Sequence, residues 1–157
     1  MEKQRMSLLR LLVGYYGILQ IVHFCALALE SLRWQQTGVP RILAPPPAGG
    51  WSQQARWLLV GTGVADAIVI PFSVLFAWGW IKGKAWSGWL GALTLGSSAF
   101  SAVIFGVGTF PTGAWSQNIA YWIEAVLFAP VGFLLILFIR HLLKSPGANA
   151  TSANSYS

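Results

Sequence analysis

The chain has 157 residues, of which 55% are hydrophobic and only 9% are charged. A soluble domain carries about 25% charged residues, so this composition favours a protein that lies in a lipid bilayer. The formal net charge of +6 does not indicate nucleic-acid binding, because the basic residues form no dense cluster interleaved with aromatic residues. The single cysteine, Cys25, excludes an internal disulfide framework and a cysteine-based zinc site.

Four apolar runs, residues 11–29, 57–81, 85–110 and 119–139, each reach the roughly 18 to 20 residues that a helix needs to cross a hydrocarbon core. The sequence therefore predicts an all-α, integral membrane four-helix bundle. Nine Trp residues, most of them near the ends of these runs, are typical of the aromatic belts at membrane–water interfaces. The expected helices are, approximately, 8–30, 55–81, 85–110 and 117–143.

The first run has an alternative interpretation as a cleaved signal peptide. A basic segment, residues 3–10, precedes it, and residues 26–28 resemble a cleavage site. However, the run is longer than the usual apolar core of about 7 to 15 residues, and it carries Gln20 and His23, which suit a packed helix. We expect the helix to be retained, although the sequence leaves the alternative open.

The distribution of Lys and Arg predicts the orientation, because short loops rich in these residues stay on the cytoplasmic side. One side holds seven of them: Lys3, Arg5, Arg10, Lys82, Lys84, Arg140 and Lys144. The other side holds three: Arg33, Arg41 and Arg56. Both termini are therefore predicted to be cytoplasmic, in a plasma or inner membrane in preference to the endoplasmic reticulum.

Two segments fall outside the predicted helices. The outer loop, residues 31–54, contains Pro40, the run Pro45 to Pro47, and Gly49 with Gly50, all of which favour extended or turning backbone. We expect it to cap the outer surface. Residues 145–157 are mainly Ser, Ala, Asn and Gly, so they cannot bury enough apolar surface to fold, and a disordered tail is predicted.

Small residues mark the predicted helix contacts. Gly88, Ala92 and Gly96 recur at every fourth position of the third helix, which predicts a face on which neighbouring helices can pack closely.

Ionisable and hydroxyl side chains recur at similar depth in the predicted helices. An ionised acid inside a membrane costs at least ~2.5 kcal/mol on insertion scales, so such a residue is usually turned inward, paired or protonated, and is often functional. At about 1.5 Å per residue, Asp66 lies near the midplane. His23, Glu124 and three serines, Ser97, Ser98 and Ser101, lie between the midplane and the outer side.

We expect these groups to line one cavity that opens toward the outer side. The candidate ligand-binding residues are Asp66, Glu124, His23, Ser97 and Ser101. The alternative is that Asp66 only pairs with His23 and fixes the register of the helices.

The sequence contains no convincing motif of a soluble enzyme. Gly61-Thr62-Gly63 is not followed by the further glycine that a dinucleotide loop needs. Two carboxylates and one histidine are too few to assign a metal site. We expect no cofactor and no metal, and the sequence assigns no catalytic residue.

From Asp66 to Trp86 the sequence resembles the EXPERA-domain group, the emopamil-binding sterol isomerases and their non-catalytic relatives. The similarity consists of Asp66 followed by Pro71, the turn at residues 81–84 followed by Trp86, and Ala129-Pro130 in the last helix. It implies a bundle of membrane helices with acidic residues in a pocket for sterol-like cationic ligands. The histidine and glutamate pair that the isomerases carry on one helix was not found, so the resemblance implies no catalytic residues.

The chain also resembles the DoxX-like group of small bacterial membrane proteins. The similarity lies in residues 8–14, Leu-Leu-Arg-Leu-Leu-Val-Gly, and in an acid in the second helix. It too implies four membrane helices, and neither resemblance implies a reaction.

Three functions follow as hypotheses. The first is the binding of a membrane lipid or hydrophobic small molecule in the outer-half cavity. The second is an enzyme on a lipid-soluble substrate, with Asp66 as general acid or base and Glu124 or His23 as its partner. The third is a structural or assembly subunit of a larger membrane complex, or a homo-oligomer.

Overall fold

The computed structural model describes residues 2–38 and 43–144, and over these ranges the chain is helical without any strand. Four helices are long and apolar enough to cross a membrane, as predicted. The elements are α1 (Glu2–Thr37), α2 (Gln53–Ile81), α3 (Ser87–Thr109), the 3-10 turn η1 (Phe110–Thr112), α4 (Ala114–Gln117) and α5 (Ala120–Lys144). The predicted disordered tail and Pro40 lie outside the described residues.

Helix α1 is longer at both ends than the predicted helix 8–30. Residues 31–37, which were assigned to the outer loop, continue the helix. The helix continues because these residues include neither Gly nor Pro. It ends at Gly38, which has a φ of 69° and donates its N–H to the Trp34 carbonyl at 2.8 Å. A glycine in this left-handed conformation is the common end of a helix.

The ends of α2 follow local sequence signals. Ser52 precedes the helix, and its hydroxyl accepts a hydrogen bond from the Ala55 N–H at 3.2 Å, which is the usual arrangement of an N-cap. At the other end the chain turns through Gly83, with a φ of 66°, and the Lys84 N–H donates to the Gly79 carbonyl at 2.8 Å. The short basic turn between α2 and α3 is therefore tight, as its sequence predicted.

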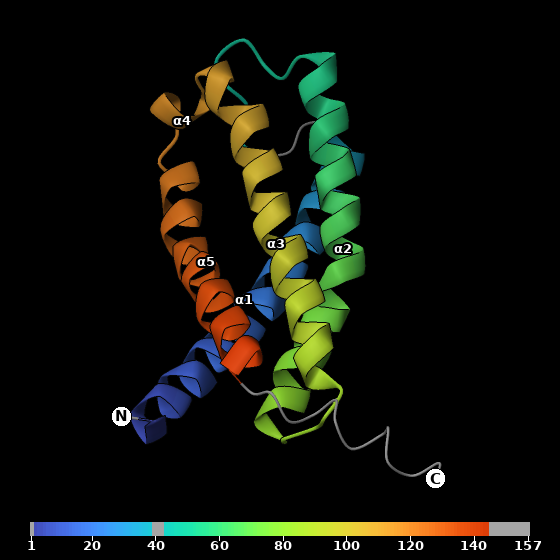
Figure 1. Ribbon diagram of the computed structural model, residues 1–157. Coiled ribbons are helices and arrows are strands. Elements are labelled where there is room, and N and C mark those ends of the chain that lie inside the picture. The colour runs from blue at the N-terminus through green and yellow to red at the C-terminus, as the bar shows by residue number, and fades with distance from the viewer. Residues whose placement is uncertain (1, 39–42, 145–157) are drawn as a thin grey trace, which may run out of the picture.

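The four long helices form a closed ring (Figure 1). α2 and α5 each pack against both α1 and α3. α1 crosses the other helices obliquely (Figure 1), and the Tyr16 hydroxyl of α1 reaches Ser98 of α3 across the ring. Only side chains therefore fill the centre of the ring.

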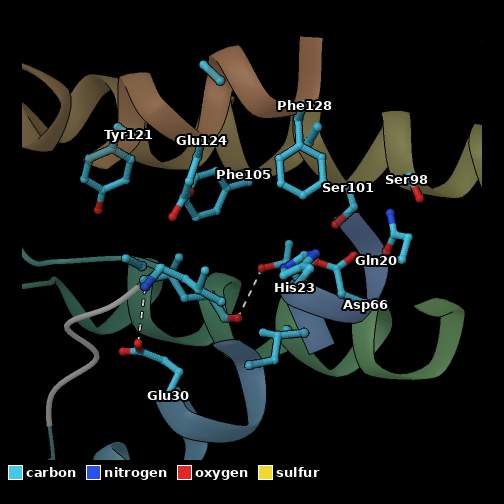
Figure 2. Close-up of a pocket in the computed structure, with 18 of the residues that line it drawn as sticks. Gln20, His23, Glu30, Asp66, Ser98, Ser101, Phe105, Tyr121, Glu124 and Phe128 are labelled. Atoms are coloured by element: carbon cyan, nitrogen blue, oxygen red, sulfur yellow. Dashed lines mark hydrogen bonds and ion pairs between the residues drawn. The ribbon is translucent and has the colours of Figure 1, made fainter. Parts of the chain in front are cut away.

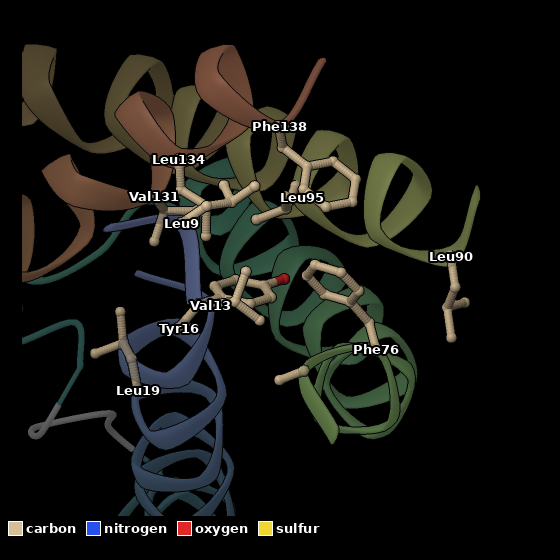
Figure 3. Close-up of a cluster of buried hydrophobic side chains, with 11 residues drawn as sticks. Leu9, Val13, Tyr16, Leu19, Phe76, Leu90, Leu95, Val131, Leu134 and Phe138 are labelled. Carbon is tan, nitrogen blue, oxygen red and sulfur yellow. The ribbon is translucent and has the colours of Figure 1, made fainter. Parts of the chain in front are cut away.

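The half of the bundle that contains the turn between α2 and α3 is densely packed (Figure 3). Val13, Phe76, Leu95, Leu134 and Phe138 are essentially inaccessible to solvent. The rings of Phe76 and Phe138 meet edge to face, with centroids 5.2 Å apart. Aromatic pairs favour this geometry, and it joins α2 to α5 at the centre of what we call the packed half.

The close helix contact differs from the predicted one. On α3 the buried residues of the packed half include Gly91 rather than Ala92 or Gly96. A Cβ atom at Gly91 would collide with the rings of Phe76 and Phe138, whereas a Cβ at Gly96 would meet nothing within 4 Å. Of the predicted face, Gly88 does lie close to α5, where a Cβ would meet Leu142 at 3.4 Å, but the closest approach is at Gly91, because two large rings fill the bundle centre opposite it.

Candidate ligand-binding cavity

The other half of the bundle encloses a cavity of about 350 Å³ (Figure 2). All four long helices, α4 and the segment after α1 contribute to it. Its lining residues are Gln20, His23, Leu27, Glu30, Trp34, Leu43, Ala44, Leu59, Thr62, Gly63, Asp66, Ser98, Ser101, Ala102, Phe105, Trp115, Tyr121, Glu124, Ala125, Phe128 and Ala129.

Helix α1 supplies one continuous face of the cavity. Gln20, His23, Leu27, Glu30 and Trp34 follow one another at spacings of three and four residues, which is the period of a single helix face. Along this face the cavity extends for about four turns of α1.

A polar group of side chains lies at the end of the cavity next to the packed half, which we call the floor. His23 Nε2 lies 4.0 Å from Asp66 Oδ2, so that an imidazole of α1 faces a carboxyl of α2. Ser101 of α3 lines the cavity beside the same carboxyl (Figure 2). The Phe128 ring of α5 packs edge to face on the imidazole, with centroids 5.3 Å apart. Four helices thus meet at this pair.

Two groups of the floor have unused hydrogen-bonding capacity. His23 Nδ1 is buried and has no hydrogen-bond partner in the described part of the chain. Gln20 is only 2% exposed, it lines the cavity beside Asp66 and Ser98, and within the described residues its carboxamide makes no hydrogen bond. Buried polar groups are normally hydrogen-bonded, so exceptions in a cavity indicate a site for a polar group of another molecule or for water.

Tyr16 closes the floor toward the packed half. Its hydroxyl lies 2.8 Å from the Ser98 hydroxyl, donates to the Ser73 hydroxyl at 2.8 Å and lies 3.3 Å from the Thr94 carbonyl. The ring itself is fully buried and packs on Phe76. One residue therefore joins the polar floor to the apolar core and ties α1 to both α2 and α3.

A second polar group lies at the end of the cavity nearest the segment between α1 and α2, which we call the mouth. It consists of Glu30 from α1 and of Tyr121 and Glu124 from α5, which Figure 2 shows apart from the floor residues. Glu30 is 6% exposed, and one of its oxygens accepts the Leu43 N–H at 3.2 Å. Glu30 and Glu124 come from opposite sides of the cavity (Figure 2).

The segment between α1 and α2 is tied down across the mouth. The Tyr121 hydroxyl donates to the Pro45 carbonyl at 2.8 Å, and the buried Trp51 indole donates to the Ala44 carbonyl at 3.1 Å. The Ala48 N–H donates to the Gln117 side chain at 2.7 Å. The described residues of this segment, 43–52, therefore form a cap, as the prolines and glycines of the predicted outer loop suggested.

The cavity is acidic in composition and otherwise mainly apolar. Three carboxyl groups, those of Glu30, Asp66 and Glu124, line it, whereas no Lys or Arg is found among its described lining residues. Between the floor and the mouth the walls are formed by apolar side chains such as Leu27, Phe105 and Phe128. Such a space favours an organic molecule with few polar groups, one of them a cation or a hydrogen-bond donor.

The structure brings together four of the five predicted site residues. Asp66, Glu124, His23 and Ser101 all line the cavity, and Ser97 does not. The error comes from helix geometry, because the residue that lies with Ser101 on this face of α3 is the one three positions earlier, Ser98, and not the one four positions earlier.

Sequence reasoning missed several polar residues of the cavity, among them Gln20, Glu30, Thr62 and Tyr121. Glu30 stands just after an apolar run, so it was not counted as an intramembrane acid, although it follows His23 by seven residues on the same helix face. Gln20 and Tyr121 each lie three residues before an identified residue, and this helical spacing was the signal that would have found them.

The described residues contain no group of three His, Cys, Asp or Glu side chains that could hold a metal ion. The His23 and Asp66 pair therefore gains no third ligand of these types from elsewhere in the described chain.

Comparison with known proteins gives no relative from which a role for this cavity could be transferred, because no family model, curated protein or solved structure matches the chain.

Proposed function

We propose that this protein binds a lipid or another hydrophobic small molecule inside the membrane, in the cavity between its four long helices. The observation that supports this function is the enclosed space itself, of about 350 Å³, in a bundle whose other half is densely packed. Sites for small molecules are typically about 300 to 1,000 Å³, mainly apolar, with a few placed polar groups. The cavity has each of these properties.

Asp66 is the residue on which binding depends most. It lies at the floor between His23 and Ser101, where it meets a hydroxyl or cationic group of the ligand. The flanking apolar walls hold the rest of the molecule. A carboxyl so far from water is costly unless it is paired, so a ligand that completes its surroundings is stabilised by the same interaction.

The lipid-facing surface supports a location inside a bilayer. Large apolar side chains such as Leu11, Phe100, Val107 and Val126 are more than 60% exposed on the long helices. Four of the nine Trp residues lie near the turn between α2 and α3, namely Trp78, Trp80, Trp86 and Trp89. The other five, Trp34, Trp51, Trp57, Trp115 and Trp122, lie toward the opposite end.

The proposed orientation has both termini in the cytoplasm and the cap on the outer side of a plasma or inner membrane. Single cysteines in a Cys25→Ser background test it. A cysteine at Gly49, in the exposed part of the cap, should react with an impermeant maleimide added outside intact cells. A cysteine at Lys84, in the turn between α2 and α3, should react only after the membrane is opened. The reverse pattern would place the cavity mouth on the cytoplasmic side.

The binding function is tested by extracting small molecules from the purified protein and comparing Asp66→Asn with the wild type. We expect a hydrophobic compound to co-purify near one copy per chain, as measured by native mass spectrometry and lipidomics. Asp66→Asn should reduce its occupancy at least about tenfold, which corresponds to one charge-assisted hydrogen bond, while expression and melting temperature stay unchanged.

Two controls separate binding from folding in this experiment. Ser97→Ala changes a polar residue of the same depth outside the cavity and should leave occupancy unchanged. Glu124→Gln should have a smaller effect than Asp66→Asn on a ligand seated at the floor. If nothing co-purifies and both acid variants behave as the wild type in every assay, binding is excluded and a role in assembly with another membrane protein or with a second copy becomes the better explanation.

An enzymatic function is the second candidate, because His23 and Asp66 face each other at 4.0 Å in a cavity, an arrangement suited to general acid and base catalysis. Incubation of the purified protein with the co-purifying compound distinguishes the two. A change in the mass or isomer of the compound that His23→Gln abolishes would show turnover, and its unchanged recovery would leave binding alone.

A further inference from the structure

The lining residues of the cavity differ in how far they are exposed at the surface of the bundle. Among the described lining residues only Ala102 of α3 and Ala129 of α5 are exposed, and the others are buried or half-buried. Both alanines lie within the apolar spans of their helices, where a membrane protein is surrounded by hydrocarbon rather than by water. The cavity therefore reaches the surface at a level that faces lipid.

Helix rotation places both exposed alanines at the boundary between α3 and α5, which are neighbours in the ring (Figure 1). Ser101 lies on the α2 side of the cavity (Figure 2), and the next residue, Ala102, is turned about 100° around the helix axis, away from α2. In the same way Phe128 packs on the imidazole of α1, and Ala129 is turned away from α1. Because each alanine still lines the cavity, each faces the other of its helix's two neighbours.

The contacts between α3 and α5 lie at two levels and leave a space between them. Toward the cap, Phe105 stacks on Tyr121, with centroids 5.9 Å apart. Toward the packed half, a Cβ at Gly91 would collide with the ring of Phe138. Between these levels Gly132 is exposed on the same face of α5 as the exposed alanine, and a Cβ there would meet nothing within 4 Å. We call this space, bordered by residues 102, 129 and 132, the lateral opening.

The surface around the lateral opening is apolar. Val103 and Phe133, which are 61% and 51% exposed, stand beside it on α3 and α5. Residues 99–106 and 125–133 include no charged side chain. A charged group inside a membrane is costly unless it is paired. The lateral opening therefore favours the passage of an uncharged molecule that is dissolved in the bilayer.

The mouth, by contrast, is covered by the cap. The Tyr121 hydroxyl donates to the Pro45 carbonyl at 2.8 Å, and the Ala48 N–H donates to the Gln117 side chain at 2.7 Å. Ala44, which is only 5% exposed, lines the cavity beneath the cap. Entry from water at this end requires the cap to detach, whereas entry from the bilayer leaves these hydrogen bonds intact.

Gln20 offers a partner for an uncharged polar group at the floor. Its side chain is 2% exposed, lies in the cavity beside Ser98 (Figure 2) and makes no hydrogen bond within the described chain. The carboxamide has both donors and an acceptor. His23 Nδ1 is also without a partner there, whereas the Asp66 carboxyl is already faced by the imidazole. A hydroxyl or carbonyl group therefore satisfies the unused capacity of the floor.

We propose that the cavity takes up its ligand sideways from the bilayer, through the lateral opening between α3 and α5, and that this ligand is an uncharged lipid. Its hydroxyl or carbonyl group meets Gln20 at the floor, and its apolar part lies against Phe105 and Phe128 or extends through the lateral opening into the membrane. This inference rests on the proposed binding function. It adds the route of entry and restricts the ligand to uncharged molecules.

The test uses dodecanol with a photoreactive diazirine in the middle of its chain. Vesicles of phosphatidylcholine that contain the full-length protein are mixed with vesicles that contain the probe, and samples are illuminated at increasing times. Peptide mass spectrometry then measures adducts at Ser98 and Phe128, which line the cavity, and at Val107, which is 70% exposed. Labelling of Val107 reports arrival in the bilayer, and the later rise of cavity labelling reports entry.

Variants distinguish the two routes. A double variant, Ala102→Phe with Ala129→Phe, should slow the rise of cavity labelling about tenfold without changing labelling of Val107, because two rings must move aside. Val103→Phe adds a ring next to the lateral opening and should leave the rate unchanged. Tyr121→Phe removes a hydrogen bond of the cap and should also leave it unchanged. Ala102→Leu and Ala129→Leu, tested singly, replace the double variant if that protein does not fold.

Two matched probes test the class of the ligand. Dodecylamine with the same diazirine carries an ammonium group and should label the cavity at least about tenfold less than the alcohol does, relative to labelling of Val107. Dodecane with the same diazirine lacks the polar group and should label the cavity several-fold less than the alcohol. In Gln20→Leu the alcohol should lose this advantage over dodecane.

The outcomes separate this inference from the binding function. Cavity labelling that rises at the wild-type rate in the blocked variants, or that rises faster in Tyr121→Phe, would place entry at the mouth and overturn the lateral route, while binding stands. Equal cavity labelling by the amine and the alcohol would overturn the uncharged class. If no probe labels the cavity of the wild type and no compound co-purifies, the binding function fails as well.

Discussion

The packed half and the hollow half of the bundle are built from the same four helices and differ in what fills the centre. In the packed half Phe76 and Phe138 meet across the axis, and Gly91 lets α3 approach them. In the hollow half the centre holds carboxyl, imidazole, amide and hydroxyl groups around open space. Lipid is as apolar as the core, so helices in a membrane associate through close contact rather than by excluding water. The close contacts of the packed half therefore contribute most of the free energy of helix association, and the hollow half depends on them to stay assembled.

The largest difference in stability between the two halves is expected when a glycine of each half is replaced by alanine. Gly91→Ala places a Cβ against the rings of Phe76 and Phe138 and should lower the free energy of unfolding by about 1–3 kcal/mol, the usual cost of overpacking. Gly63 lines the cavity, where a Cβ would meet only Leu27 at 3.7 Å. Gly63→Ala should raise the free energy of unfolding by up to about 1 kcal/mol through helix propensity. Unfolding in mixed micelles measures both, and equal effects would contradict the division into two halves.

A smaller effect is expected at the boundary between the halves. Tyr16→Phe removes the hydroxyl that joins Ser73 and Ser98 and should lower the free energy of unfolding by about 1 kcal/mol, within the range for hydrogen bonds in membranes. Tyr15→Phe removes one bond, from the Tyr15 hydroxyl to the Leu127 carbonyl at 2.7 Å, and serves as the matched control with a loss of about 0.5 kcal/mol. A Tyr15 variant less stable than the Tyr16 variant would show that the floor is not held by this network.

The smallest change in stability is expected at the cap. Tyr121→Phe removes the bond to the Pro45 carbonyl and should cost about 0.5–1 kcal/mol, but it should speed hydrogen exchange in residues 43–52 several-fold by opening the cap locally. Exchange measured by mass spectrometry checks this. Ser116→Ala removes a bond to the Gly113 carbonyl inside the α4 turn and should leave exchange in the cap unchanged. Equal exchange in both variants would show that Tyr121 does not retain the cap.

The number of helices and their approximate limits could be predicted, because the length of an apolar run is fixed by the thickness of the bilayer. The end of α1 was missed because the apolar run ends at residue 29, whereas the helix continues to Thr37. The signal that ends the helix is Gly38, which has a positive φ. The predicted contact face of α3 included Gly88 but missed Gly91, the point of closest approach, for a related reason. A small-residue pattern shows where helices can approach, but which face is used depends on large partners such as Phe76 and Phe138, and these lie far away in the sequence.

The site could be predicted from depth but not in detail. Counting residues from the ends of the runs placed Asp66, His23 and Glu124 at neighbouring levels, and they do line one cavity. The estimated depth of a residue in the membrane does not say toward which side of its helix the side chain points. For this reason Ser97 was chosen, whereas Ser98 lines the cavity. Glu30 was also missed as a cavity residue, because it follows the apolar run, whereas α1 continues beyond it to Thr37.

The length of α1 links the cavity to the thickness of the bilayer. A helix of 36 residues is roughly 54 Å long, against about 30 Å for a hydrocarbon core. α1 also crosses its neighbours obliquely (Figure 1), as a helix that exceeds the membrane does when it tilts. Its outer part carries Glu30 and Trp34, so a change of tilt moves one wall of the cavity mouth. Reconstitution in lipids of increasing chain length should therefore alter the occupancy of the cavity by its ligand, through hydrophobic mismatch, before it alters the melting of the packed half.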